Sequence, residues 1–326
     1  MRVSTFIFGV VAIVHAAAVV TSSQPEVGKI RSTETIVTSG PYSFPEKLAL
    51  DRFGNLYLLD SQLSNIFVIH RQRNGQQVKP FCSPRTPVAA ADLSVDRSGK
   101  MWILDSRGSQ IVKLDRGCKV EKRLTLQRPG LAVEINSAGE LIVLTSTGNE
   151  LFDLYEQNGS LIRSFGHRIS YGDPISDGEL NNGHVVADRS GGFFFSFNYP
   201  PLVQHYQRDG KLIGEFKPPS DIHIGPPNVS SQKQGNLLAV RANYQILVLD
   251  MTLDARGRLI FLISGKPKYQ AIAQGSQTLL VVNGAGRVLR KLTIEDAAFH
   301  RLVAGSTALY LLRNRDGLRL DKFQLP

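Results

Sequence analysis

The chain has 326 residues, of which 42% are hydrophobic and 20% are charged, and it contains 29 Gly, 16 Pro and 2 Cys. This apolar share excludes a wholly disordered chain, and two cysteines exclude both a disulfide-rich scaffold and a zinc cluster of three or four cysteines. Lys and Arg exceed Asp and Glu by 38 − 28 = 10, so nucleic acid, anionic membrane and acidic ligands all stay open as partners.

The first 23 residues have the pattern of a secretory signal peptide. Arg2 precedes an apolar run that begins at Phe6, and small residues follow at Ala16 to Ala18. The alternative is an uncleaved membrane anchor, but the run is short for the roughly 20 residues that span a bilayer. We therefore expect a signal peptide at 1–23, a secreted or periplasmic protein, and no transmembrane segment in the mature chain.

A four-residue turn recurs along the mature chain and predicts a repeated β-hairpin. Its clear copies are Asp51–Gly54, Asp96–Gly99, Asn136–Gly139 and Asp188–Gly191, each between two short apolar runs. Asp or Asn accepts a hydrogen bond from the backbone two residues on, and Gly takes the positive φ angle. Fainter copies continue the pattern at Gly235, Gly275 and Gly305. Repeats of about 40 to 50 residues with several short strands are typical of propeller blades.

The repeat predicts an all-β propeller but leaves the number of blades open. We count seven units and expect seven blades, with six as the alternative, in a single domain at 24–326. The segment Ile30 to Thr38 is a strand with no partner of its own. It can become an outer strand of the last blade and close the ring, which removes an exposed strand edge.

The first unit resembles an NHL repeat. It has Pro45, an apolar strand, the D-x-x-G turn, a second strand that ends at Asp60, and a third strand to Ile69; Asp105 repeats Asp60 in the second unit. The resemblance covers about residues 40 to 265 and implies a secreted β-propeller of a bacterial type that is often six-bladed. It implies a fold and says little about activity, because propellers include both binding modules and enzymes.

The two cysteines are expected to lie toward opposite faces of the ring. Cys82 follows the fourth strand of the first unit, whereas Cys118 comes directly after the third turn of the second unit. A disulfide needs Cα atoms about 4.4 to 6.8 Å apart. The sequence therefore favours two separate thiols over a Cys82–Cys118 bond.

Two connections between blades, residues 167–183 and 217–232, are unusually long. Both join a fourth strand to the next first strand, so both lie on one face beside the fourth unit. Long loops on a rigid scaffold often bind ligands, and we predict a protein, peptide or glycan ligand on this face. The alternative is a pair of structural loops that cover the central opening. The candidate ligand-binding residues are His167, Tyr171, Asp173, Asp177, Glu179, His184, Phe197, Tyr199 and His223.

Three histidines are weak candidates for a metal site, because NHL-like lyases use inward-facing His and a metal. His184, His223 and His300 do not stand at one repeating distance from the glycine of their units, which argues against a shared site. We expect no cofactor, with zinc at these histidines or calcium at the acidic residues of the first long loop left open. No catalytic residue is assigned.

The sequence favours a monomeric, non-enzymatic binding or scaffold propeller. The alternative is a metal-dependent lyase or hydrolase with its site at the mouth of the channel, but the first strands show no repeated set of Glu, Asn and Asp. Nucleic acid is not an expected partner, because no cluster of Lys and Arg is interleaved with aromatic residues.

Overall fold

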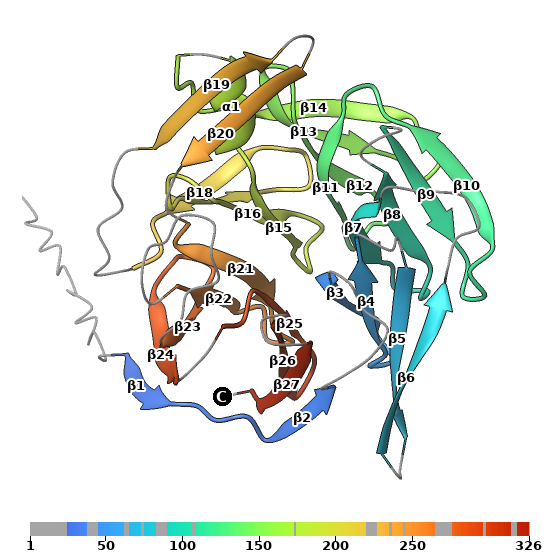
Figure 1. Ribbon diagram of the computed structural model, residues 1–326, viewed down its shortest axis with the longest axis vertical. Helices are drawn as coiled ribbons and strands as arrows, with labels where there is room; N and C mark the ends of the chain where they lie inside the picture. The colour runs from blue at the N-terminus through green and yellow to red at the C-terminus, as the bar shows by residue number, and fades with distance from the viewer. Residues whose placement is uncertain are drawn as a thin grey trace, which may run out of the picture.

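The computed structural model describes residues 25–37, 45–61, 65–72, 75–82, 90–105, 109–172, 174–219, 227–234, 237–243, 246–264, 276–295, 298–313 and 318–325. Two short strands come first, β1 (Glu26–Lys29) and β2 (Glu34–Val37). The strands that follow form six antiparallel sheets arranged around a centre, and one separate hairpin (Figure 1).

The six sheets are the blades of a propeller, and each is built from consecutive strands. The first blade has β3 (Pro45–Leu50), β4 (Leu56–Asp60), β5 (Asn65–Gln72) and β6 (Gly75–Cys82). The second has β7 (Ala90–Val95), β8 (Met101–Asp105), β9 (Gln110–Leu114) and β10 (Val120–Thr125). The third has β11 (Gly130–Ile135), β12 (Leu141–Thr145), β13 (Glu150–Tyr155) and β14 (Leu161–His167).

The chain continues in the same way through the second half of the ring. The fourth blade has β15 (Gly183–Ala187), β16 (Phe193–Phe197), β17 (Val203–Tyr206) and β18 (Leu212–Phe216), and the fifth has β21 (Val248–Leu253), β22 (Leu259–Ile263), β23 (Gln277–Val282) and β24 (Val288–Ile294). The sixth has β25 (Arg301–Ala304), β26 (Ala308–Arg313) and β27 (Arg319–Gln324). Helix α1 (Pro174–Leu180) precedes the fourth blade, and the hairpin β19 (Asn228–Gln234) and β20 (Leu237–Asn243) precedes the fifth.

The inner strands of the blades form a closed circle. Each inner strand contacts the next in the order β3, β7, β11, β15, β21 and β25, and β25 contacts β3 again. In Figure 1 these strands converge around the centre, with the outer strands at the rim. The described part of the chain is therefore a six-bladed β-propeller.

The expected count of seven blades is corrected to six. The hairpin β19–β20 is a separate two-stranded sheet, and the fifth unit of the sequence count falls on it. Its marker Gly235, like Gly275 of the sixth unit, lies outside the described residues. The first turn of the fifth blade is Asp254–Gly257, where Gly257 N donates to Asp254 O at 3.0 Å. Spacing alone cannot tell an inserted hairpin from a blade, since both supply short strands and a glycine turn.

The repeated turn forms for the reason that the sequence suggests. Asp51 Oδ1 accepts hydrogen bonds from the backbone N of Phe53 (2.8 Å) and Asn55 (2.9 Å), and Gly54 has φ +86°. Asn136 makes the same two contacts with Ala138 and Glu140. One side chain thus satisfies two backbone donors of the turn, and the turn fixes the register of both strands.

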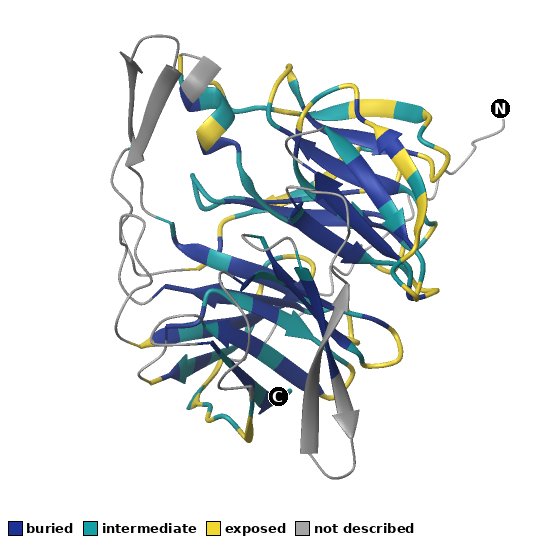
Figure 2. Cartoon of the chain, turned by 45° about the vertical axis from the view of Figure 1, so that its right-hand side comes forward, coloured by how far each residue is buried: buried dark blue, intermediate teal, exposed yellow. Residues whose placement is uncertain are grey.

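The core consists of apolar side chains packed between neighbouring blades. The second strands are buried along their whole length in the first five blades, and exposed residues gather at turns and on outer strands (Figure 2). Phe152, Phe193 and Phe195 form an aromatic cluster between the third and fourth blades, with Phe152 4.9 Å and 5.1 Å from the other two ring centres.

The two N-terminal strands lie on the outer edges of the last blades. Strand β2 pairs antiparallel with β27, with Thr35 opposite Asp321. Strand β1 pairs parallel with β24, with Val27 opposite Lys291. The segment from 26 to 37 therefore bridges the fifth and sixth blades along the rim, as the blue strands of Figure 1 show.

The expectation of two separate thiols is wrong, because Cys118 is disulfide-bonded. Cys118 has φ +67°, and its side chain packs against the apolar cluster between the first and second blades. The assignment of faces from the strand order assumed that Cys118 points away from the first blade, whereas it packs against the cluster that the first two blades share. Among the described residues, no helix is long and apolar enough to cross a membrane.

Candidate functional site

The six inner strands can be aligned through their pairing with the second strands of the blades. One position near the start of each inner strand is then equivalent in all six blades. The residues at this position, which we call the channel ring, are Lys47, Asp92, Ala132, His184, Asp250 and Arg301. In β3, β7, β11 and β21 the strand pairing shifts immediately before this position. Such bulges change the direction of a side chain, so the same local irregularity sets the direction of the ring residue in four blades.

The channel ring lies beside a cavity of about 140 Å³. Lys47, His184 and Asp250 line the cavity, together with Ser94 and Glu134. Inner strands begin on the face that carries the fourth-to-first connections, so the ring is near the face of residues 167–183. This volume suits one amino-acid side chain or a few water molecules, at about 30 Å³ for each water.

Two aspartates of the ring each join neighbouring blades and hold a basic side chain. Asp92 Oδ1 lies 3.0 Å from Lys47 Nζ, and Asp92 Oδ2 accepts a hydrogen bond from Val133 N at 2.9 Å. Asp250 repeats the arrangement on the other side of the ring: its Oδ1 lies 3.2 Å from His184 Nδ1, and its Oδ2 accepts from Leu302 N at 2.8 Å. These contacts fix both carboxylates, because buried charges are stable only when they are paired and hydrogen-bonded.

Glu134 lies on β11, two residues after the ring position Ala132, and it also lines the cavity. Its Oε1 accepts a hydrogen bond from Ser94 Oγ at 3.3 Å. Burial, reinforced by the charge of Asp92 and opposed by Lys47, raises the pKa of Glu134 to about 7. A carboxyl with this pKa can donate or accept a proton at neutral pH.

The surrounding charges act on one another across the channel. Burial lowers the pKa of Lys47, but Asp92, Asp250 and Glu134 outweigh it, so this pKa lies above its ordinary value. Burial raises the pKa of Asp250, but the hydrogen bond and charge of His184, with Arg301 and Lys47, bring it down to about 2. The ring therefore carries fixed charges of both signs at neutral pH.

His300 stands at the start of the sixth blade and has a different role. Its Nε2 donates to Pro45 O at 3.2 Å, and burial together with the charge of Arg301 lowers its pKa to about 4. The imidazole is therefore neutral at pH 7 and links the sixth blade to the first. Its Nδ1 is buried and has no hydrogen-bond partner.

The histidines named as candidate metal ligands either have other partners or lie outside the described residues. Within the described part of the chain, no three His, Cys, Asp or Glu side chains form a group that could hold a metal ion. His184 is paired with Asp250, His300 is turned toward Pro45, and His223 lies outside the described residues. Lys47 and Arg301 add positive charge to the same ring.

Two candidate residues of the first long connection, Tyr171 and Asp177, contact each other at helix α1. Tyr171 N donates to Asp177 Oδ1 at 2.5 Å, and Tyr171 Oη donates to Tyr199 O at 3.2 Å. The two tyrosine rings lie 6.1 Å apart, and Asn181 holds both the N and the O of Ile169 at 2.8 Å. This connection is thus held against the fourth blade, and α1 contacts β19 and β20.

The other candidates are not all brought together. His167 is exposed at the end of β14 and Glu179 is exposed on α1, whereas Phe197 is fully buried in the core against Phe195. Asp173 lies outside the described residues. Of the candidate residues, His184 is the one that belongs to the channel ring.

Sequence reasoning missed most of the ring, although a signal was present. Lys47, Asp92, Ala132, His184 and Asp250 each stand seven residues before the glycine of their first turn, for example 54 − 47 = 7. Four of these five side chains are charged or polar, within strands that contain mostly apolar residues. Comparing the blades position by position would have shown this, but the misplaced fifth repeat hid Asp250.

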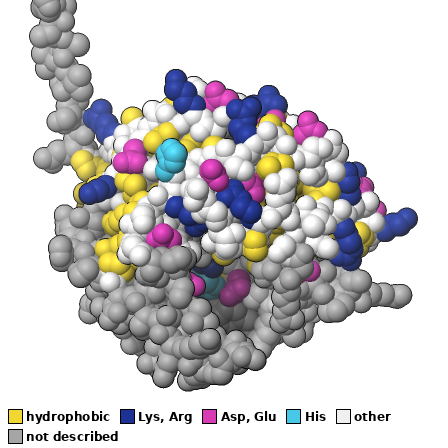
Figure 3. Space-filling model, turned by 90° about the horizontal axis from the view of Figure 1, so that it is seen from above, with side chains coloured by type: hydrophobic (Ala, Val, Ile, Leu, Met, Phe, Trp, Pro, Cys, Tyr) yellow, Lys and Arg dark blue, Asp and Glu magenta, His cyan; other side chains and the backbone are white. Residues whose placement is uncertain are grey.

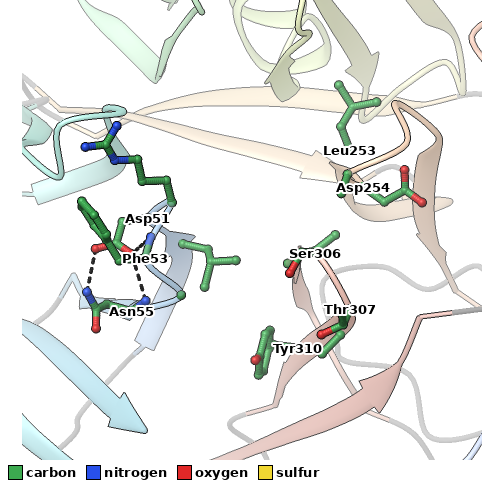
Figure 4. Close-up of a pocket in the computed structure, with 15 residues that line it drawn as sticks. Asp51, Phe53, Asn55, Leu253, Asp254, Ser306, Thr307 and Tyr310 are labelled. Atoms are coloured by element: carbon green, nitrogen blue, oxygen red, sulfur yellow. Dashed lines mark hydrogen bonds between the residues drawn. The ribbon is translucent and has the colours of Figure 1, made fainter.

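A larger pocket of about 550 Å³ opens on the opposite face, between the first turns of the fifth, sixth and first blades (Figure 4). The hairpin of the sixth blade carries small residues there, Gly305 to Thr307. The acids of this pocket are already engaged: Asp51 accepts from Asn55 and Tyr57, and Asp254 Oδ2 pairs with Arg258 at 2.6 Å. The other polar residues that line this pocket are Arg52, Asn55, Ser306, Thr307 and Tyr310.

No protein-family profile matches the chain, and no curated protein matches it. Solved structures with the same fold include virginiamycin B lyase from Staphylococcus aureus, with 11% identity, a TM-score of 0.55 and coverage of 90% of this chain and 99% of that one. A member of the DUF4221 family from Bacteroides vulgatus has 10% identity, a TM-score of 0.58 and coverage of 91% and 94%.

A third similar structure is regucalcin from Agrobacterium tumefaciens, described as a calcium-binding protein. It has 10% identity, a TM-score of 0.54 and coverage of 93% of this chain and 98% of that one. At these identities the likeness shows the fold alone, so the class established here is a six-bladed β-propeller.

Proposed function

We propose that the chain is an exported, monomeric, NHL-like binding propeller that recognises a peptide segment at the mouth of its channel. The observation that carries the proposal is the channel ring, where the Lys47–Asp92 and His184–Asp250 pairs place Lys47, His184 and Asp250 in the lining of a cavity. Fixed charges of both signs match the charged and amide groups of a peptide better than the hydroxyl groups of a neutral glycan.

The cavity is large enough for only a part of a peptide ligand. About 140 Å³ accepts one side chain, so the rest of the ligand has to lie on the surrounding face. That face carries residues 167–183, and Tyr171 of this connection forms an aromatic pair with Tyr199 of the connection between β16 and β17. Rigid aromatic side chains add binding area at low conformational cost.

The charge pattern of the outer surface supports a peptide over a polyanion. On the face drawn in Figure 3, Lys and Arg are interspersed with Asp and Glu. Several basic residues are paired, such as Lys100 with Glu121 and Arg208 with Glu140. Nucleic acid binding needs a continuous basic tract instead.

We also propose that the N-terminal strands close the ring in the mature domain at 24–326, after removal of a signal peptide at 1–23. The pairing of β2 with β27 and of β1 with β24 supports this, because each strand covers an edge that would otherwise be free.

The binding proposal is tested by selecting peptides from a displayed random library on the immobilised mature protein and titrating one selected peptide. We expect Lys47→Met and Glu134→Gln to abolish enrichment and Lys100→Met, which breaks a surface ion pair, to leave it unchanged. Thermal unfolding confirms that each variant is folded. Equal enrichment on all four proteins, or binding to a glycan array without peptide enrichment, would overturn the proposal.

The second candidate is a lyase or hydrolase with its site at the same mouth. The observation that favours it is the pKa of about 7 at Glu134, which suits a general acid or base. One of the similar structures, virginiamycin B lyase, is described as a lyase. Metal analysis of the purified protein separates the candidates: stoichiometric zinc or calcium that is lost in His184→Ala would favour a metal-dependent enzyme over a binding protein.

A further inference from the structure

A second polar pocket lies at the rim of the propeller, under the N-terminal segment. It has a volume of about 400 Å³ and lies between β1, the link that follows it, and the strands β24, β26 and β27. Its charged lining residues are Lys29, Arg31, Glu295, Arg313, Arg319 and Asp321. Figure 1 shows the N-terminal segment along β24 and β27 at this place.

Positive charge exceeds negative charge in this pocket. Four basic side chains face two acids, which gives a net charge of 4 − 2 = +2. Both acids are already engaged, Glu295 with Lys29 and Asp321 with Arg319, whose Nε lies 2.8 Å from Asp321 Oδ1. Asp321 Oδ1 also accepts a hydrogen bond from Thr35 Oγ1 at 2.7 Å. The acids therefore cannot neutralise the other two cations.

Arg313 is the residue whose position needs a further partner. It lies directly opposite Arg319 in the pairing of β26 with β27, and like charges directly opposite each other destabilise a sheet. Its Nε is buried and has no hydrogen-bond partner. Within the described residues, neither Arg313 nor Arg31 forms an ion pair. A buried donor without a partner destabilises the folded state.

We propose that this pocket binds a phosphate group. Guanidinium groups bind tetrahedral oxyanions through two parallel N–H donors, and a dianion matches the net charge of the pocket. The phosphate would lie between Arg313 and Arg319, remove their repulsion, and fasten the N-terminal segment through Arg31. The group can come from free phosphate or from a phospholipid headgroup, which share this chemistry.

The test measures thermal unfolding of the mature protein during a titration with inorganic phosphate at constant ionic strength, with chloride as the reference anion. We expect a saturating rise of about 5 °C when phosphate exceeds its dissociation constant about 100-fold. Arg313→Met and Arg31→Met lose the rise, whereas Arg256→Met, an exposed arginine in a turn of the fifth blade, keeps it. Arg313→Met is expected to fold, because it removes a like-charge contact.

A second arm measures sedimentation of the protein with phosphatidic acid vesicles and with phosphatidylcholine vesicles. Binding to the former that is lost in Arg313→Met, without an effect of free phosphate, assigns the site to a lipid headgroup and supports the proposal. A phosphate effect of equal size in the wild type and in both pocket variants reflects general salt stabilisation and overturns it. Absence of any effect in both arms overturns it as well.

Discussion

The environment of Glu134 leads to the prediction that removing its charge stabilises the protein at alkaline pH. Burial raises its pKa from 4.5 to about 7, so the folded chain holds a proton that the unfolded chain has released. The stability from this group is fully present below pH 4.5 and is lost as the pH rises through about 7. Above pH 7 the folded state carries the cost of a charged carboxylate in the channel.

The size of this cost follows from the pKa difference. The step from 4.5 to about 7 corresponds to about 3 kcal/mol, at about 1.36 kcal/mol for each pH unit. Glu134 keeps partial contact with solvent, so screening reduces the effect to about 1–2 kcal/mol. Glu134→Gln keeps the shape of the side chain and removes the charge. We therefore expect its free energy of unfolding, relative to wild type, to rise by about 1–2 kcal/mol between pH 5 and pH 8.5.

Urea unfolding of both proteins across this pH range measures the effect. Glu179→Gln, an exposed glutamate on α1, is the matched control and should follow the wild-type curve. A difference between Glu134→Gln and wild type that does not change with pH would refute the reasoning, because it would mean that Glu134 has the same affinity for protons in both states.

Three further predictions concern the ring, the core and the N-terminal strands. Asp250→Ala leaves Leu302 N and His184 without their acceptor and should lower the free energy of urea unfolding by about 2–4 kcal/mol. The folded pKa of Asp250 is about 2, so the stability that this group gives the wild type is present above pH 3.8 and falls as the pH drops toward 2. The variant should lack this fall in stability. Phe152→Ala opens the aromatic cluster and should cost about 3–5 kcal/mol in thermal or urea unfolding, whereas the exposed Phe53→Ala should stay within about 0.5 kcal/mol of wild type. Deleting residues 25–37 frees the edges of β24 and β27. The variant should therefore unfold at a lower temperature, and light scattering should detect its self-association. A monomeric deletion variant with unchanged unfolding temperature would argue against ring closure by these strands.

More of the fold than of the site could be predicted from the sequence, because the sequence pattern that specifies the fold is local. Each D-x-x-G turn fixes two strands within about ten residues, so the propeller class and the blades with clear turns followed directly from the sequence. The count failed at residues 228–243, where an inserted hairpin imitates a blade. Asp254–Gly257 carries the same turn motif as Asp51–Gly54, and this similarity was the available correction.

The channel ring could not be predicted in full because its contacts join distant segments. Asp92 meets Val133 and Lys47, and Asp250 meets Leu302 and His184, at separations of 41 and 52 residues for the backbone contacts. The distance of seven residues to each turn glycine marks the position, but it does not tell which residue pairs with which. Those pairs depend on the order of blades around the ring, which requires the correct blade count.

The most direct test of the account is calorimetric titration of one selected peptide against the wild type, Lys47→Met and Lys100→Met. If the channel ring is the binding site, Lys47→Met weakens binding at least about tenfold, because a lost charge-assisted contact costs about 1.5–3 kcal/mol, and Lys100→Met binds as the wild type does. Equal affinity for all three proteins would contradict the account and place the ligand elsewhere on the propeller.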